Sequence, residues 1–292
     1  MNQMKQKRFG AYNNYKQLKT NHIMKNSNNP IVQDVIERFN TVYKLNKIFV
    51  TGNSAQKGII ISGDAGTGKS HYVQKAFVDS NVTDKVDYNK SKSFSAAALY
   101  VKLYLNRNEG DVVVFDDCNL AGMSGNDFKT LVDLFKGATE MTKGERMLGW
   151  ERATTNPLMK DNNVPHEFNF QGSIVWITNY SFEQLAKKFG PHWEAIQSRF
   201  INVPIRLNDQ EKLMYTLFLV EEIGMLSGDI CQTKEGGYSD TIVTATTKYI
   251  RDNYKFMNNV TARVAAKIAD TMENFPEDWK LIIENQTMSS NV

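Results

Sequence analysis

The sequence predicts an α/β fold in which a parallel sheet carries helices on both faces, followed by a small all-helical domain. Three observations lead to this prediction. Apolar runs of strand length alternate with helical stretches, as expected for a parallel sheet. A glycine-rich turn at residues 63–70 joins the first apolar run to a helix, and strand-like patterns stop after Pro204. The chain has 292 residues, which corresponds to about two packed units at roughly 150 residues each.

The first helix is predicted just after Pro30, where apolar residues recur at helical spacing. These residues are Ile31, Val35, Phe39, Val42 and Leu45. The spacing predicts an amphipathic helix ahead of the first strand, with its apolar face packed on the α/β core. We therefore expect a basic polar arm over residues 1–30, the α/β core over 31–205 and the helical lid domain over 206–292.

The first strand is predicted at Gly58–Ser62, an apolar run that leads directly into the glycine-rich turn. The turn consists of Gly63, Asp64, Ala65, Gly66, Thr67, Gly68, Lys69 and Ser70. This is the phosphate-binding P-loop pattern, in the strand-loop-helix context that the pattern requires. Its glycines allow backbone N–H groups to turn inward around phosphates, and a helix that begins near Lys69 adds the positive end of its dipole.

The P-loop pattern predicts a nucleotide site with a magnesium ion. Lys69 should neutralise the β- and γ-phosphates, and Ser70 should ligate Mg²⁺ through its hydroxyl, because this hard cation prefers oxygen ligands. The alternative is a glycine-rich turn that binds nothing. The filled lysine and serine positions, together with the strand in front of them, favour the nucleotide site.

A second buried strand is predicted at residues 111–117, after a helix over Ala96–Tyr104. Asp116 and Asp117 close its apolar run, and the carboxyl end of a buried parallel strand faces a site. Asp116 matches the Walker B aspartate, which holds Mg²⁺ through water. Asp117 stands where a carboxylate can orient and deprotonate an attacking water. The alternative, a pair of acids at a helix N-cap, is less favoured with a P-loop upstream.

A third buried strand is predicted at residues 173–179, after a helix over 126–138, and it also ends in a polar residue, Asn179. Residues 143–171 alternate apolar with polar side chains around a loop rich in Asn, Asp and Pro, which predicts an inserted hairpin. The last part of the chain is predicted to form helices at residues 209–225, 240–253 and 260–272.

These motifs together resemble the AAA+ ATPases, P-loop proteins in which a RecA-like α/β core carries a helical lid and subunits assemble into rings. The resemblance runs from about Ile48 to about Ala269. It implies ATP and Mg²⁺ as ligands. It also implies a homo-oligomeric ring, such as a hexamer, with ATP at the interfaces between subunits.

The same resemblance assigns three further residues. In this family a polar residue at the end of the strand after Walker B senses the γ-phosphate, so Asn179 is the sensor 1 candidate. An arginine after a following helix reaches the neighbouring subunit's nucleotide, and Arg199 matches that signature, with Arg206 as the runner-up. Arg263 lies in a segment similar to the sensor 2 helix and would contact the γ-phosphate in cis. For Arg199 and Arg263 the alternative is a surface salt bridge.

Asp117 departs from the family pattern, because most members carry Glu at this position. The shorter side chain draws the base back by one methylene, so slow hydrolysis is expected. The Asp-Asp pair is similar to that of bacterial replication initiators, some helicase loaders and papillomavirus-type helicases. The wider pattern, including a Gly-Trp segment and Phe-x-Phe-x-Gly before the third strand, resembles uncharacterised P-loop ATPases of bacteriophages. These similarities imply a role in DNA replication.

The inserted hairpin is similar in position to the pre-sensor hairpin of AAA+ subgroups, including viral superfamily-3 helicases, where hairpins line the ring pore. The similarity implies that its cations face a polymer, namely Lys143, Arg146, Arg152 and Lys160. Trp150 would either stack on a base or pack beneath the hairpin. Packing is favoured, because aromatic side chains dominate cores.

A basic arm opens the chain, because residues 1–30 carry six Lys and Arg residues and no acid, interleaved with aromatic residues. Such an arm can bind the phosphates of DNA while its aromatic side chains stack on bases. The alternative is a solvated tail, since polar ends with few apolar residues rarely pack.

The composition narrows the class of protein. The net charge is only +3, and the two cysteines, Cys118 and Cys231, lack the spacing of a disulfide framework or a zinc site. No apolar run is long enough to span a bilayer, and the N-terminus lacks the apolar core of a signal peptide. We expect no membrane partner and a cytoplasmic location, in the host cytoplasm if a phage encodes the protein.

Three functions are consistent with the sequence. The leading one is an ATPase that acts on DNA as a helicase, helicase loader or initiator, with a replication protein as partner. The second is a protein-remodelling ATPase, but Tyr88–Phe94 lacks the aromatic-aliphatic-glycine triplet of the pore loop in ring unfoldases. The third is an assembly factor gated by nucleotide binding, in which turnover is incidental.

Overall fold

The computed structural model describes residues 27–52, 54–142, 144–151 and 156–288. This part of the chain divides into two compact units. The first contains Thr41–Gly63 and Lys69–Ile205. The second contains residues 27–40, the P-loop residues Asp64–Gly68 and residues 206–288. The P-loop is thus continuous in sequence with both units.

The first unit is built on a parallel sheet, which confirms the predicted fold class. Its strands lie in the order β2-β3-β6-β1-β7. Their bounds are β1 (Gly58–Gly63), β2 (Val86–Lys90), β3 (Val112–Asp116), β6 (Ser173–Thr178) and β7 (Ile201–Ile205). The three central strands are entirely buried. They are also the three strands that the sequence predicts, because a strand covered on both faces reads as a continuous apolar run.

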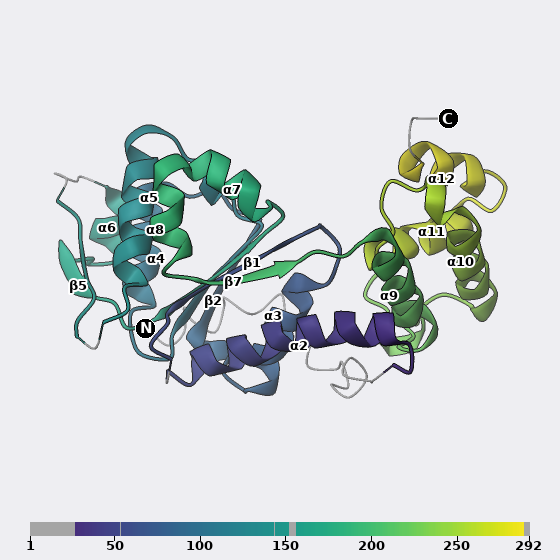
Figure 1. Cartoon of the computed structure of the whole chain (residues 1–292), viewed down its shortest axis with the longest axis horizontal. Coiled ribbons are helices and arrows are strands. Elements are labelled where there is room, and N and C mark those ends of the chain that lie inside the picture. Colours follow the sequence, from purple (N-terminus) through teal and green to yellow (C-terminus); the bar gives the residue numbers. More distant parts are fainter. Residues whose placement is uncertain (1–26, 53, 143, 152–155, 289–292) are drawn as a thin grey trace. The chain divides into compact units, whose positions relative to one another are not determined.

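Helices cover both faces of this sheet (Figure 1). The helix that follows the P-loop, α3 (Lys69–Asp79), lies on one face. The opposite face is covered by α4 (Ala96–Leu105), α5 (Gly125–Ala138), α7 (Phe182–Phe189) and α8 (Trp193–Gln197). Short 3₁₀ turns at Thr83–Lys85, Leu120–Gly122 and Gly190–His192 connect some of these elements.

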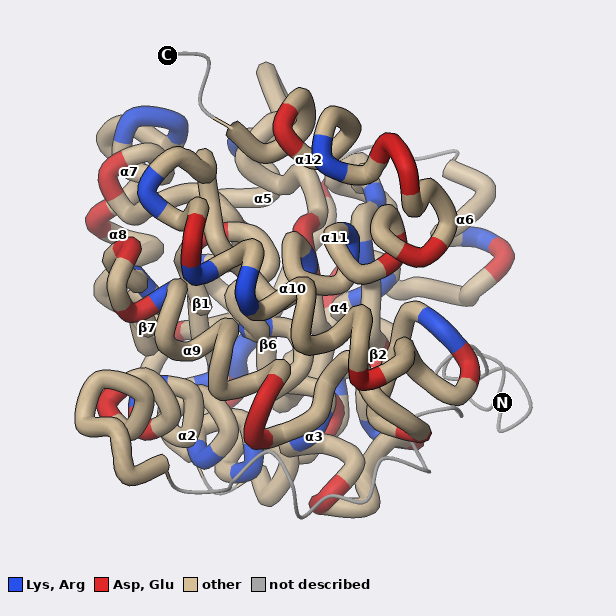
Figure 2. The backbone as a smooth tube through the Cα atoms, turned by 90° about the vertical axis from the view of Figure 1, so that its right-hand side faces the viewer, with Lys and Arg blue, Asp and Glu red and all other residues tan. Residues whose placement is uncertain are grey.

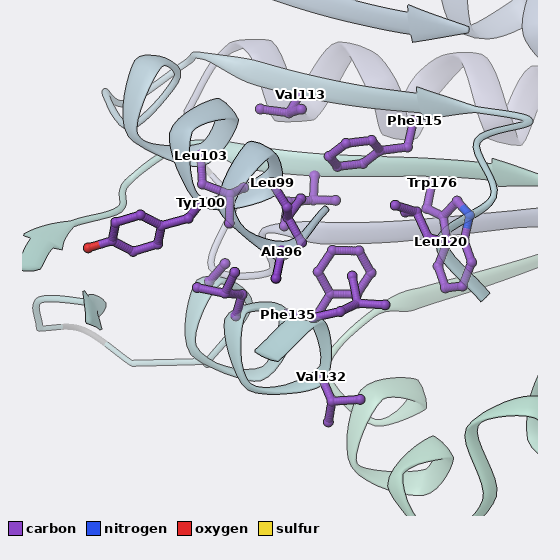
Figure 3. Packing of buried hydrophobic residues seen from close by; sticks show 14 of the residues in the cluster. Ala96, Leu99, Tyr100, Leu103, Val113, Phe115, Leu120, Val132, Phe135 and Trp176 are labelled. Atoms are coloured by element: carbon purple, nitrogen blue, oxygen red, sulfur yellow. The ribbon is translucent and has the colours of Figure 1, made fainter. Parts of the chain in front are cut away.

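An aromatic core fills the space between the sheet and the helices α4 and α5 (Figure 3). The ring of Phe135 on α5 lies 6.4 Å from that of Phe115 and 5.9 Å from that of Trp176, centroid to centroid. Since successive side chains of a strand point to opposite faces, Phe115 on this face places Asp116 on the face that α3 covers. The strand pattern therefore aims the predicted Walker B carboxylate toward the P-loop helix.

The inserted hairpin is present as β4 (Met147–Gly149) paired antiparallel with β5 (Glu167–Asn169). A short helix, α6 (Pro157–Asp161), lies within the insertion. Trp150 is 6% exposed, and its ring centroid lies 5.4 Å from that of Tyr100 on α4. Trp150 therefore packs beneath the hairpin, which is the favoured one of its two predicted roles.

The second unit contains four helices after β7: α9 (Asp209–Glu221), α10 (Asp240–Asn253), α11 (Ala262–Asn274) and α12 (Trp279–Thr287). Short 3₁₀ turns at Gly228–Ile230 and Tyr254–Phe256 flank α10. The first three helices match the predicted ones, and α12 was not predicted. Only nine residues long, α12 buries Ile283 but leaves Leu281 62% exposed, so it shows little helical periodicity.

The helix α2 (Pro30–Val50) contributes its first half to the second unit. Phe39 stacks on Tyr215 of α9, with ring centroids 5.5 Å apart. Arg38 forms an ion pair with Glu211 and donates a 2.8 Å hydrogen bond to the carbonyl of Arg206. The first half of this helix therefore packs on α9 within the second unit, and its second half, from Thr41 on, belongs to the first unit.

None of the helices in the described ranges combines the length and the apolar character needed to cross a membrane. Cys118 is buried and Cys231 is half-buried, and both are free thiols.

Candidate functional site

The P-loop leaves the carboxyl end of β1 through glycines that the backbone requires. A Cβ atom at Gly63 would lie 2.0 Å from the carbonyl oxygen of Ile205 in the adjacent strand, so no larger residue fits. Gly66 and Gly68 have φ angles of +78° and +108°, which only glycine adopts without strain. A backbone turned this way directs successive N–H groups inward, which is the geometry of an anion-binding loop.

Lys69 is the first residue of α3, and its side chain is held by oxygen atoms. It is 5% exposed, and its Nζ donates hydrogen bonds to the carbonyl of Gly63 at 2.6 Å and to Asn179 Oδ1 at 3.1 Å. A buried ammonium group is stable only with such partners. The contacts keep the positive charge at the carboxyl end of β1, between the P-loop and the end of β6.

The next residue, Ser70, meets the predicted Walker B aspartate. Ser70 Oγ donates a 2.9 Å hydrogen bond to Asp116 Oδ1, and Tyr88 donates a 2.7 Å hydrogen bond to Asp116 Oδ2. Asp116 itself is 2% exposed. A hydroxyl oxygen and a carboxylate oxygen in contact are a ligand pair that suits Mg²⁺. The donor set thus fits the predicted cation.

Asp117 and Asn179 lie next to this pair, at the ends of neighbouring strands. Asn179 Nδ2 donates to Asp117 Oδ1 at 3.0 Å, while its Oδ1 accepts from Lys69. Asp117 has φ +52°, and its backbone N–H bonds the carbonyl of Ile177 at 3.0 Å. Non-glycine residues rarely adopt this conformation, which costs of order 1–3 kcal/mol and concentrates at functional sites. It turns the exposed Asp117 carboxylate out of the line of β3, toward Asn179.

His71 follows Ser70 without adding charge. Burial is the main cause that lowers the pKa of His71 to about 4, with the positive charge of Lys75 as a second cause and the opposing charge of Asp79 as a third. The imidazole is therefore neutral at pH 7. The positive charge at this end of α3 comes from Lys69 and from the helix dipole.

In the second unit, the P-loop residues contact the C-terminal helices. Lys212 of α9 forms a 2.7 Å ion pair with Asp64. A Cβ atom at Gly66 would lie 3.0 Å from Thr261 Oγ1, the N-cap of α11. Arg263 is exposed in the first turn of α11, two residues after Thr261. The sensor 2 candidate is thus on a helix whose N-cap touches the phosphate loop.

Arg199 lies at the amino ends of the strands, whereas Lys69 lies at their carboxyl ends. It precedes β7, whose first residue, Ile201, pairs with Ile59 at the amino end of β1. Its Nε donates to Glu140 Oε2 at 2.8 Å, so it forms the half-exposed ion pair that was its alternative. This position keeps Arg199 away from Lys69 of its own chain. Arg206, the runner-up, is exposed.

The prediction that the hairpin cations face a polymer is wrong for Arg146. It is 4% exposed, and its guanidinium donates to the carbonyl of Phe170 at 2.9 Å and to Gln171 Oε1 at 3.0 Å. Burial lowers the pKa of Arg146. Lys160 is exposed on α6. Lys143, Arg152 and most of the basic arm (residues 1–26) lie outside the described residues.

Sequence reasoning missed two residues of this site, Tyr88 and Lys212. Tyr88 lies in β2, where polar residues interrupt the apolar pattern. Lys212 is the one lysine of α9, and nothing in its sequence neighbourhood links it to Asp64. Both contacts depend on strand register and tertiary packing, which a local pattern does not record.

Comparison with known proteins finds a relative in sequence and several distantly similar solved structures. No family model matches the chain. It is 27% identical over 259 residues to an uncharacterised 36.7 kDa protein of Enterobacteria phage T4 from the nrdC-mobD intergenic region, covering 87% of this chain and 75% of that protein.

Among solved structures, the Thermotoga maritima RuvB Holliday junction branch migration motor is 12% identical, with a TM-score of 0.45, over 87% of this chain and 68% of RuvB. Brucella abortus NtrX in complex with ATP is 11% identical, with a TM-score of 0.43, over 90% and 61% of the two chains. Independently of these comparisons, the chain has the sheet order, the P-loop after the central strand β1 and the helical C-terminal region described above. These features give the chain a P-loop α/β fold with a helical C-terminal region, and its sequence is similar to that of a bacteriophage protein.

Proposed function

We propose that this protein binds ATP with Mg²⁺ at the P-loop and hydrolyses the γ-phosphate, as a ring-forming ATPase that acts in DNA replication or remodelling. The observation that carries the proposal is the bridge formed by Asn179, which joins Lys69 to Asp117. Three predicted site residues from three separate segments meet there. The neighbouring hydrogen bond between Ser70 and Asp116, the two proposed cation ligands, supports a cation site beside them.

Each residue has a distinct role in this proposal. Lys69 would neutralise phosphate charge, and Asn179 would sense the γ-phosphate and orient the attacking water. Asp117 would accept the proton of that water. Ser70 and Asp116 would hold Mg²⁺, which neutralises the charge that develops on the phosphates. Arg263 and the inward N–H groups of the P-loop would add positive potential at the γ-phosphate.

The position of Arg199 supports a site shared between subunits. Because Arg199 lies at the amino ends of the strands and Lys69 at their carboxyl ends, Arg199 would serve as an arginine finger only for a neighbouring copy. Subunits in a ring contact one another head to tail, so a finger on one surface can meet the nucleotide on the next subunit's other surface. Arg199 would then have to break its ion pair with Glu140 to contact the phosphates bound by the neighbouring subunit.

Mixing two inactive variants should restore activity if Arg199 acts in trans. Arg199→Ala and Asp117→Asn subunits should each hydrolyse little ATP alone. In an equimolar random mixture, about a quarter of the interfaces combine an intact Asp117 with an intact Arg199 from the neighbour. Turnover should be measured across mixing ratios. Arg251→Ala, which breaks the comparable Arg251–Glu221 ion pair on α10, is the control and should stay active. Failure to recover activity at every ratio would contradict the shared site.

Charged segments of the chain bear on the proposed action on DNA. The basic arm and Lys160 favour it. The helices α7 and α8 carry both signs of charge (Figure 2). Their exposed charged residues are Glu183, Lys187, Lys188 and Glu194. These two helices therefore offer no single-sign track for a phosphate backbone.

Steady-state ATP turnover with and without single- and double-stranded DNA tests this part, with Lys69→Ala as the blank. We expect one form of DNA to stimulate turnover, and the stimulation should weaken as salt rises. Slow turnover that no DNA stimulates would contradict a DNA-coupled motor. It would favour the alternatives, a protein-remodelling ATPase or a nucleotide-gated assembly factor.

A further inference from the structure

We propose that Tyr88 is a positioning residue for the Walker B aspartate: its phenol fixes the Asp116 carboxylate so that a cation meets one preset oxygen. This inference rests on the proposed function, because it concerns the same cation. No sequence motif points to Tyr88. The assignment comes from the 2.7 Å hydrogen bond that Tyr88 donates to Asp116 Oδ2.

The strand register explains how Tyr88 reaches Asp116. Tyr88 pairs with Val114 in the neighbouring strand, and Lys90 pairs with Asp116. Side chains two apart on a strand share a face, so Tyr88, Val114 and Asp116 all project to the side of the sheet that α3 covers. Tyr88 is 7% exposed. Its phenol donates to the carboxylate oxygen of Asp116 that Ser70 does not bond.

The two carboxylate oxygens of Asp116 therefore have different partners. Oδ1 accepts from Ser70 and Oδ2 from Tyr88. The terminal torsion of an aspartate is broad, so one hydrogen bond leaves the carboxylate plane loosely defined. A second, charge-assisted bond fixes it. When a cation takes the place of the Ser70 contact, the Tyr88 bond can remain, and Oδ1 is the oxygen left to face the cation.

The backbone around Tyr88 is tied to the same strand end. Ser91 N–H donates to the carbonyl of Asp116 at 2.9 Å, and the Cys118 thiol donates to the carbonyl of Asn89 at 3.3 Å. The end of β2 is thus held against the residues on both sides of Asp117. A phenol anchored in this way sits at a fixed distance from the carboxylate, which is what a positioning role requires.

A matched pair of variants separates positioning from simple loss of a buried hydroxyl. Tyr88→Phe removes only the oxygen that bonds Asp116. Tyr100→Phe removes another buried hydroxyl in the same unit, which lies 2.8 Å from the carbonyl of His166 in the inserted hairpin. Both variants should lose a similar amount of stability, and thermal melting would show this. Only Tyr88→Phe should change the response to Mg²⁺.

The experiment is a Mg²⁺ titration with two readouts: the affinity for a fluorescent ATP analogue at equilibrium, and ATP turnover. Mutation of a residue that orients a metal ligand typically lowers metal affinity or activity about 10- to 100-fold. We expect the Mg²⁺ concentration at half-effect to rise by about that factor in Tyr88→Phe. Affinity for the analogue in EDTA should stay at the wild-type value, and Tyr100→Phe should match wild type in both readouts.

An unchanged Mg²⁺ midpoint in Tyr88→Phe, or an equal shift in Tyr100→Phe, would overturn this inference and leave the proposed ATPase intact. A wild-type protein that binds the analogue with no Mg²⁺ dependence would instead overturn the proposed cation site, and the role of Tyr88 with it.

Discussion

Lys69→Ala should abolish ATP turnover and weaken nucleotide binding by about 100-fold, which corresponds to the loss of strong contacts between an ammonium and phosphates. The side chain is 5% exposed and already bound to two oxygen atoms. Its charge is thus held in place before nucleotide arrives, and little ordering entropy opposes binding. Titration of a fluorescent ATP analogue measures the affinity, and phosphate release measures turnover.

A second buried lysine on the same helix provides the control for Lys69→Ala. Lys75 forms a 2.8 Å ion pair with Asp79, and its side chain is 6% exposed. Lys75→Ala also removes a buried ammonium, but one that has its own partner away from the P-loop. It should lower stability and keep wild-type nucleotide affinity. If Lys69→Ala bound nucleotide as tightly as wild type, the P-loop would not be the nucleotide site.

Asp117→Asn should lower turnover by about 10²- to 10⁴-fold, the usual contribution of a general base. Nucleotide affinity should persist, because Lys69, Ser70 and the P-loop are untouched. The fold should also persist, since Asn tolerates the left-handed conformation at φ +52° better than most residues. The amide oxygen of the new residue can still accept from Asn179. Single-turnover hydrolysis and analogue binding measure the two effects separately.

The left-handed backbone at Asp117 allows a sharper version of this test. Asp117→Gly relieves the strain and should raise or maintain the melting temperature while turnover is lost. Asp117→Ala also removes the carboxylate but keeps the strain, at a cost of about 1–2 kcal/mol relative to glycine. Turnover within tenfold of wild type in the Asn variant would mean that another group activates the water.

The elements that local sequence predicts are the ones with strong local signals. The P-loop is a pattern of residue types at fixed spacing, and β3 and β6 are apolar runs that end in polar residues. In contrast, Asp87 and Asn89 interrupt β2, and Pro204 interrupts β7, so neither strand has such a run. Both lie at the edges of the sheet, where one side of a strand is free of partners and polar residues and proline are tolerated.

The residues of the candidate site also divide into those that local sequence predicts and those that depend on tertiary packing. Asp116, Asp117 and Asn179 follow from where strands end, because parallel strands bring their carboxyl ends to one edge. Tyr88 and Lys212 depend on which strand lies beside which and on how a distant helix packs. Tyr88 and Lys212 were missed, whereas Arg146 was assigned a role that its position does not fit. A cation in a polar stretch suggests a solvent-facing charge, but the guanidinium of Arg146 bonds the carbonyl of Phe170, just after β5, instead.

Pro204 has a consequence for how copies of this protein could associate. It occupies the outermost strand, paired with Ser62 on the inner side, and its side chain is exposed. Proline lacks the N–H that a further strand would need, and an edge that lacks a donor is a poor template for strand addition. Two copies would therefore join through side chains of helices and loops, and a ring of them would not share one continuous β-sheet. In the proposed ring, such side-chain interfaces would leave each subunit free to tilt against the next as nucleotide is bound, cleaved and released.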